Sequence, residues 1–137
     1  MNLWFFFTMK KFTLLADKNI QTSFKIVLEN ELINQNKEFL FKIHTAGSEA
    51  LQNIVRHTYR FEENKEVKIW FEKNKNEITL FIEDDGPPLR DLSFLEIKRA
   101  PSEKGNMGLN LIKKLTKSFN IEASQKGNIT ILKFEIF

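Results

Sequence analysis

The stretch EVKIWFEKNKNEITLFIEDDGPP, residues 66–88, contains two runs in which apolar and polar residues alternate. One face of each run is apolar, formed by Val67, Ile69 and Phe71 in the first run and by Ile78, Leu80 and Ile82 in the second. A period of two is typical of strands that bury one face. The polar residues KNKN between the runs favour a hairpin. We therefore predict two neighbouring antiparallel strands.

The second run ends in acids, a glycine and two prolines. Asp84 continues the apolar row, so its carboxylate is predicted to point into the protein, where it needs hydrogen-bond donors. The amino group of a purine is one such donor. Gly86 allows backbone to approach that ligand closely, and Pro87 and Pro88 end the strand. Taken alone, an acid-Gly-Pro cluster is more often a simple turn.

Sequence patterns on the amino-terminal side predict a strand and two helices. The stretch KKFTLLADKN (10–19) predicts a short strand, with Asp17 as the N-cap of a helix in which apolar residues recur between Ile20 and Leu32. The polar run NQNK (34–37) interrupts this pattern. A second helix is predicted from about Glu38 to His57.

Beyond the prolines, the stretch MGLNLIKKLTKSF (107–119) predicts a helix from the spacing of Leu109, Ile112, Leu115 and Phe119. The last residues, 120–137, predict a hairpin that turns at Lys126 and Gly127. Strands that are neighbours in sequence pair antiparallel, and the helices gather on one face. The chain is therefore predicted to form an α+β two-layer sandwich.

Composition limits the classes of function. A chain of 137 residues with 42% hydrophobic and 28% charged residues suits one domain. Its 21 basic and 18 acidic residues are interspersed, so the net charge of +3 predicts no nucleic-acid footprint. The absence of cysteine excludes a disulfide framework, and two histidines, His44 and His57, give little support to a zinc site. A cytoplasmic location fits this composition.

The amino terminus carries an aromatic run, LWFFF, at residues 3–7. The run is too short for the roughly 20 residues that span a bilayer, and it lacks the features of a signal peptide. We predict no membrane or targeting segment. Three interpretations stay open: an edge strand, a dimer contact, or residues translated upstream of a start at Met9. Residues 1–10 are accordingly treated as an extension and residues 11–137 as the domain.

Polar residues form a stripe on the second predicted helix. Glu49, Asn53 and His57 follow each other at intervals of four, with Arg56 at the flank. An amide oxygen and a carboxylate one turn apart suit a magnesium ion that is bound mainly through nucleotide phosphates. A solvated helix face is the simpler alternative.

Two glycines open the third predicted helix in KGNMGLNLI, residues 104–112. Gly105 and Gly108 are spaced so that free backbone N–H groups at the helix start can hold phosphate. Alone, the pair also fits a loop residue and a packing contact. The polar stretch from Arg90 to Met107, which has no hydrophobic period, predicts a mobile lid that orders over bound phosphates.

In this order, SEALQNIVRH (48–57), DDGPP (84–88) and GNMGLNLI (105–112) resemble the N box, the DxGxG-type box and the glycine-rich box of the GHKL ATPase superfamily. The resemblance covers about residues 11–137. It implies the Bergerat ATP-binding fold, with a mixed, mostly antiparallel sheet. The single domain, the LLAD strand-to-helix start and the DDGPP variant look most like the anti-sigma-factor serine/threonine kinases of bacterial partner-switching systems.

The resemblance implies a role for each matching residue. The implied ATP-binding residues are Asn53, His57, Asp84, Gly86, Lys104, Gly105, Asn106, Met107, Gly108, Leu109 and Asn128. Among them, Asn53 would coordinate Mg²⁺, and Asp84 would accept from the adenine amino group. Gly105 and Gly108 would hold phosphate, and Glu49 would be the catalytic general base.

The sequence departs from the family pattern at two positions. Pro88 replaces the second glycine of the DxGxG box, and Asn128 stands where many relatives have a threonine near the adenine. The second change is expected to weaken or retune the hydrogen bonds to adenine. Lys104 and Arg56 either add positive charge near the phosphates or belong to the solvated surface.

Three functions fit these observations. The first is a kinase that phosphorylates an anti-anti-sigma (STAS-type) partner and sequesters a sigma factor, acting as a homodimer without direct contact to nucleic acid or membrane. The second is an ATP-binding module that holds the same partners without turnover. The third, the catalytic half of a histidine kinase, requires a phospho-accepting helix pair for which the chain has no room. The first is the prediction.

Overall fold

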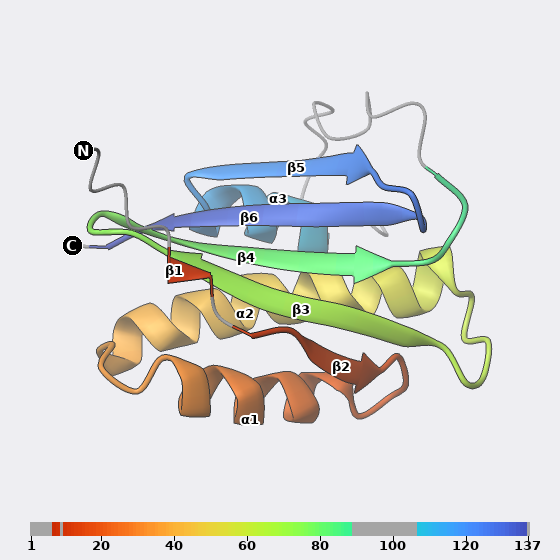
Figure 1. Cartoon of the computed structure of the whole chain (residues 1–137), viewed down its shortest axis with the longest axis horizontal. Coiled ribbons are helices and arrows are strands. Elements are labelled where there is room, and N and C mark those ends of the chain that lie inside the picture. The colour runs from red at the N-terminus through yellow and green to blue at the C-terminus, as the bar shows by residue number, and fades with distance from the viewer. Residues whose placement is uncertain (1–6, 9, 89–106, 137) are drawn as a thin grey trace.

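The computed structural model describes residues 7–8, 10–88 and 107–136. In chain order the described elements are β1 (Phe7–Thr8), β2 (Phe12–Leu15), α1 (Ile20–Glu31), α2 (Lys37–Asn53), the π-helical turn η1 (Ile54–Thr58), β3 (Glu66–Lys73), β4 (Glu77–Asp84), α3 (Met107–Leu115), β5 (Ser118–Ala123) and β6 (Asn128–Glu135). The strands form one layer and the helices cover one of its faces (Figure 1). The predicted α+β two-layer sandwich is confirmed.

The sheet has the strand order β1-β3-β4-β6-β5, and β2 also pairs with β3. The predicted hairpin of β3 and β4 is confirmed, with Ile69 opposite Ile82. Every pairing between described strands is antiparallel, so the expectation of a mixed sheet is wrong for this part of the chain. Phe7 pairs with Lys73, which places the end of the aromatic run on an edge strand, while residues 3–6 lie outside the described residues.

The core lies between the sheet and the helices. The inward residues of β3 and β4 are at most 1% exposed: Val67, Ile69, Phe71, Ile78, Leu80 and Ile82. Burying each such side chain stabilises the fold by about 1.5–3 kcal/mol. On the helical side, Phe24 of α1 packs against Gly47 of α2, where an added Cβ would lie 2.6 Å from the Phe24 ring. This glycine therefore lets α1 and α2 approach each other closely.

Three local predictions differ from the structure. Asn19, not Asp17, is the N-cap of α1; Asp17 Oδ1 instead accepts from Asn19 N–H at 2.9 Å and closes the preceding turn. Phe119 lies in β5, not in α3. The sequence pattern did not distinguish the two, because one inward apolar residue at this distance fits both the helical period and the strand period. The second helix continues beyond Asn53, but as a π turn.

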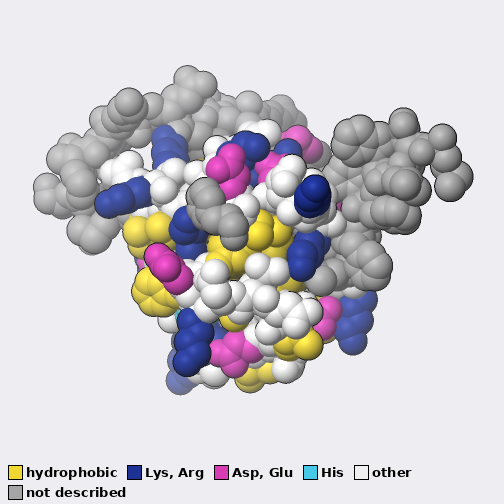
Figure 2. All heavy atoms as spheres, turned by 90° about the vertical axis from the view of Figure 1, so that its left-hand side faces the viewer, with side chains coloured by type: hydrophobic (Ala, Val, Ile, Leu, Met, Phe, Trp, Pro, Cys, Tyr) yellow, Lys and Arg dark blue, Asp and Glu magenta, His cyan; other side chains and the backbone are white. Residues whose placement is uncertain are grey.

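The outer face of the sheet carries an aromatic pair and a cavity. Trp70 stacks on Phe81 with 5.2 Å between ring centroids, and Lys11 Nζ lies 4.3 Å above the Trp70 ring. A cavity of about 230 Å³ on this face is lined by Glu72, Asn74, Glu77, Thr79, Phe81, Ile131 and Lys133 and contains none of the predicted site residues. Figure 2, which views the molecule from the turn between β3 and β4, shows basic and acidic side chains interspersed around a hydrophobic patch.

Candidate functional site

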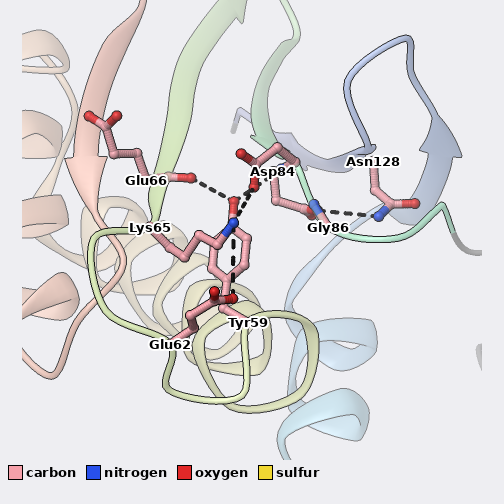
Figure 3. Close-up of polar contacts among 8 residues, drawn as sticks. Tyr59, Glu62, Lys65, Glu66, Asp84, Gly86 and Asn128 are labelled. Atoms are coloured by element: carbon pink, nitrogen blue, oxygen red, sulfur yellow. Dashed lines mark hydrogen bonds and ion pairs between the residues drawn. The ribbon is translucent and has the colours of Figure 1, made fainter.

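Asp84 ends β4 and points inward, as predicted, with 4% of its surface exposed. Its Oδ1 accepts from Gly86 N–H at 2.9 Å and from Asn128 Nδ2 at 3.2 Å. No described residue donates to Oδ2. Figure 3 shows these groups together at the end of β4 and the start of β6. One oxygen of the carboxylate is thus held by the protein, and the second can accept from a ligand.

Burial raises the pKa of Asp84, and the neighbouring charges of Asp85 and Glu83 raise it further. The hydrogen bonds from Gly86 and Asn128 lower the pKa because they favour the ionised form. The charged state of this carboxylate therefore depends on the two neutral donors. Such an acceptor, held in a low-dielectric position, makes stronger hydrogen bonds than a carboxylate in water.

Two glycines bring neighbouring segments against Asp84. A Cβ on Gly86 would lie 2.1 Å from Thr58 Cγ2, so this glycine makes room for the last residue of η1. A Cβ on Gly127 would lie 2.2 Å from the backbone oxygen of Asp84, so the turn between β5 and β6 depends on that glycine as well. Contact of Gly86 with a ligand stays a prediction.

Tyr59 was missed by the sequence reasoning. Its side chain is 3% exposed, and its hydroxyl donates to the Glu66 carbonyl at 2.6 Å and accepts from Asp85 N–H at 3.0 Å. Burial raises the pKa of Tyr59, so the hydroxyl stays protonated. Lys65 lies 5.5 Å from the ring centroid and 3.8 Å from Asp85 Oδ1 (Figure 3). No local pattern signals this role, because the partners are distant in sequence.

Glu49 meets the glycine-rich box at the contact between α2 and α3. A Cβ on Gly108 would lie 2.5 Å from Glu49 Oε2, so the carboxylate lies against the first turn of α3. The amino end of a helix is a favourable place for an acid, because its free N–H groups carry partial positive charge. The N box and the glycine-rich box are therefore brought together.

The remaining residues of the predicted stripe take different positions. Asn53 is half-buried at the last residue of α2, one turn from Glu49. His57 is exposed in η1, where the π turn shifts it from the α-helical alignment that the sequence suggested. Arg56 is exposed and donates to Gln52 Oε1 at 3.1 Å.

Part of the predicted site lies outside the described residues. This part comprises Lys104, Gly105, Asn106 and, apart from Met107, the whole of the lid predicted from Arg90 to Met107. Met107 and the half-buried Leu109 belong to the first turn of α3. The described residues thus form two groups, one at Asp84 and one at Glu49. They are linked by η1, which continues α2 and ends beside Gly86.

No helix in the described ranges is long and apolar enough to cross a membrane.

The chain is 29% identical over 104 residues to an anti-sigma F factor of Clostridium novyi (strain NT), and the alignment covers 73% of each protein. A solved structure of the RsbU and RsbW domains of a Mycobacterium tuberculosis protein has the same fold, with a TM-score of 0.63 and 15% identity. That match covers 93% of this chain and 31% of the other.

The family comparison covers most of the chain. The sequence profile of the histidine kinase-like ATPase domain matches residues 18–134, a range that contains Glu49, Asp84 and Gly108. With the agreement in fold, this match means that the chain belongs to the histidine kinase-like ATPase domain family.

Proposed function

We propose that this protein binds ATP with magnesium, phosphorylates a serine or threonine of an anti-anti-sigma (STAS-type) partner, and sequesters a sigma factor in a partner switch. The family membership supports ATP binding, and the similarity to an anti-sigma F factor supports the regulatory role. The observation that carries the nucleotide part is the Asp84 carboxylate, with Oδ1 held by two donors and Oδ2 available as an acceptor. This oxygen would accept a hydrogen bond from the exocyclic amino group of adenine.

The groups on α2 and α3 fit a hydrated magnesium ion and a phosphate chain. Asn53 supplies an amide oxygen, the kind of ligand that a hard cation accepts, from a half-buried position at the last residue of α2. The first N–H groups of α3, around Gly108, have no partner within the helix and suit phosphate oxygens. Magnesium bound here would neutralise negative charge on the phosphates.

Glu49 is proposed as the general base. Its carboxylate lies against the amino end of α3, and thus beside the proposed phosphate site. In the transfer, Glu49 takes the hydroxyl proton while the partner's oxygen bonds to the γ-phosphorus and the bond from that phosphorus to ADP breaks. The partner must therefore bring its hydroxyl to the junction of α2 and α3.

The test is transfer of label from γ-labelled ATP to candidate STAS-type partners. Wild type should label a serine or threonine of the partner, and Glu49→Gln should lower the rate by about 100- to 10,000-fold, with nucleotide affinity within a few fold. Glu38→Gln is the matched control, since Glu38 is an exposed acid on the same helix. Equal rates for wild type and Glu49→Gln would exclude Glu49 as the base.

The alternative function is a regulatory module that binds ATP and its protein partners without turnover. The departures at Pro88 and Asn128 favour keeping it as the second candidate. Wild-type protein that binds ATP and retains a sigma factor, but labels no partner, would support this alternative. Absence of nucleotide binding in calorimetry would contradict both functions.

A further inference from the structure

Asn128 is an amide buried at the first residue of β6, with 1% of its surface exposed, and it lies opposite Asp84 in the sheet register. Its Nδ2 donates to Asp84 Oδ1 at 3.2 Å and to the Pro87 carbonyl at 3.0 Å. Both of these atoms are acceptors, so only the NH₂ end of the amide can face them. The orientation of the amide therefore follows from its partners.

This amide decides which carboxylate oxygen of Asp84 is presented. Oδ1 already accepts from Gly86 N–H and from Asn128, whereas Oδ2 receives no hydrogen bond from a described residue. Rotation of the carboxylate would break both bonds to Oδ1. The carboxylate is thus oriented before any ligand arrives.

The charged groups around Asp84 do not stabilise its ionised form in place of Asn128. Glu83 and Asp85 are acids, and Lys65 pairs with Asp85 at 3.8 Å. Tyr59 also lies close, but its hydroxyl is engaged with Glu66 and Asp85. Ionisation of Asp84 therefore relies on Gly86 N–H and on the Asn128 amide.

We propose that Asn128 is a positioning residue that sets base specificity, because it holds Asp84 as an oriented acceptor for the amino group at C6 of adenine. Guanine carries an oxygen at C6, which a carboxylate repels, and its own amino group lies at C2. The inference rests on the proposed nucleotide function and adds to it the residue that enforces selection. Gly127 supports the arrangement, because a side chain there would collide with the Asp84 backbone and displace Asn128.

The first test measures ATP and GTP affinity of Asn128→Ala by calorimetry across pH. We expect about a 10- to 100-fold loss of ATP affinity, a smaller preference for ATP over GTP, and loss of binding on acidification at a higher pH than in wild type. The control is Asn120→Ala, which changes an exposed asparagine of β5. A folded Asn128→Ala variant with wild-type affinity, preference and pH profile would overturn the proposal and leave the nucleotide function intact.

Asn128→Asp provides a test that also works if the alanine variant does not fold. Two facing carboxyls share a proton when the pH is lowered, and the protonated Asp at position 128 can again donate to Asp84. ATP affinity of this variant should therefore rise from about pH 8 to about pH 6, while wild-type affinity falls or stays constant. A pH profile equal to that of wild type contradicts the proposal. Wild type without nucleotide binding would instead contradict the proposed function itself.

Discussion

Tyr59 and Asp85 are joined by a 3.0 Å hydrogen bond from the Asp85 N–H to the tyrosine hydroxyl, across 26 positions of sequence. The same hydroxyl donates to the Glu66 carbonyl at 2.6 Å. One side chain therefore fastens the corner after β4 to the start of β3. Asp84 precedes this corner, so its placement depends in part on Tyr59.

Replacing Tyr59 with phenylalanine should destabilise the protein by about 1–3 kcal/mol, because Asp85 N–H and the Glu66 carbonyl lose their shared partner. Nucleotide affinity should fall as well, since the corner that holds Asp84 loosens. Urea unfolding and calorimetry measure the two effects. Phe61→Leu, at a residue that is 69% exposed, should change neither. Unchanged stability of Tyr59→Phe would show that water replaces the hydroxyl at no cost.

The ionisation of Tyr59 can be followed directly, because it is the single tyrosine in the sequence. Burial raises its pKa in the folded protein above the usual value of about 10. Its contribution to stability is present below the unfolded pKa and is lost as pH rises through the folded pKa. Tyrosinate absorbance should therefore appear in native protein only above the pH at which it appears in denaturant. Coincident titrations would disprove the buried hydroxyl.

Asp84→Asn should raise the stability of the protein and lower its affinity for nucleotide. The raised pKa means that ionised Asp84 costs stability above its unfolded pKa, so the neutral variant should unfold with a free energy higher by about 0.5–2 kcal/mol near neutrality. This advantage should disappear in acid, where wild type is protonated. Nucleotide affinity should fall by about 100-fold, because an NH₂ group faces the base amino group. Glu38→Gln, at an exposed acid of α2, is the control.

Gly86→Ala should cost about 1–3 kcal/mol, because the new Cβ would lie 2.1 Å from Thr58 Cγ2. Thr58→Ser removes that methyl group and should recover part of the loss. The measurement is a double-mutant cycle in urea, with a coupling energy of at least about 0.5 kcal/mol expected. If the changes in unfolding free energy are additive, the backbone, not Thr58, moves to accommodate the alanine.

Gly108→Ala tests the contact with Glu49. The added Cβ would lie 2.5 Å from Oε2, which is the end of a flexible side chain, so Glu49 should move aside. Stability should be unchanged or higher by up to about 1 kcal/mol, because alanine is the better helix former. Phosphoryl transfer should fall, and the substitution should have no further effect on rate in a Glu49→Gln background. A rate loss of equal size in both backgrounds would assign the effect to phosphate binding instead.

The strands and the inward position of Asp84 were predictable, because a period of two is a local pattern in β3 and β4. The contact between Asp84 and Asn128 depends on the register of β4 with β6, which pairs residues 44 positions apart and has no local signal. The role of Tyr59 escaped prediction for the same reason. Phe119 was assigned to a helix because one apolar residue at the required distance satisfies both periods.

The π turn η1 has a consequence for how related chains differ in length. Tyr59 N–H donates to the Ile54 carbonyl at 2.8 Å, a spacing of five residues, so the turn holds one residue more than an α turn. A chain shorter by one residue between Asn53 and Tyr59 would close this turn as ordinary α-helix. Its tyrosine would then be rotated away from Glu66 and Asp85. A single-residue deletion here would therefore mark a relative that lacks this attachment, even where the tyrosine itself is retained.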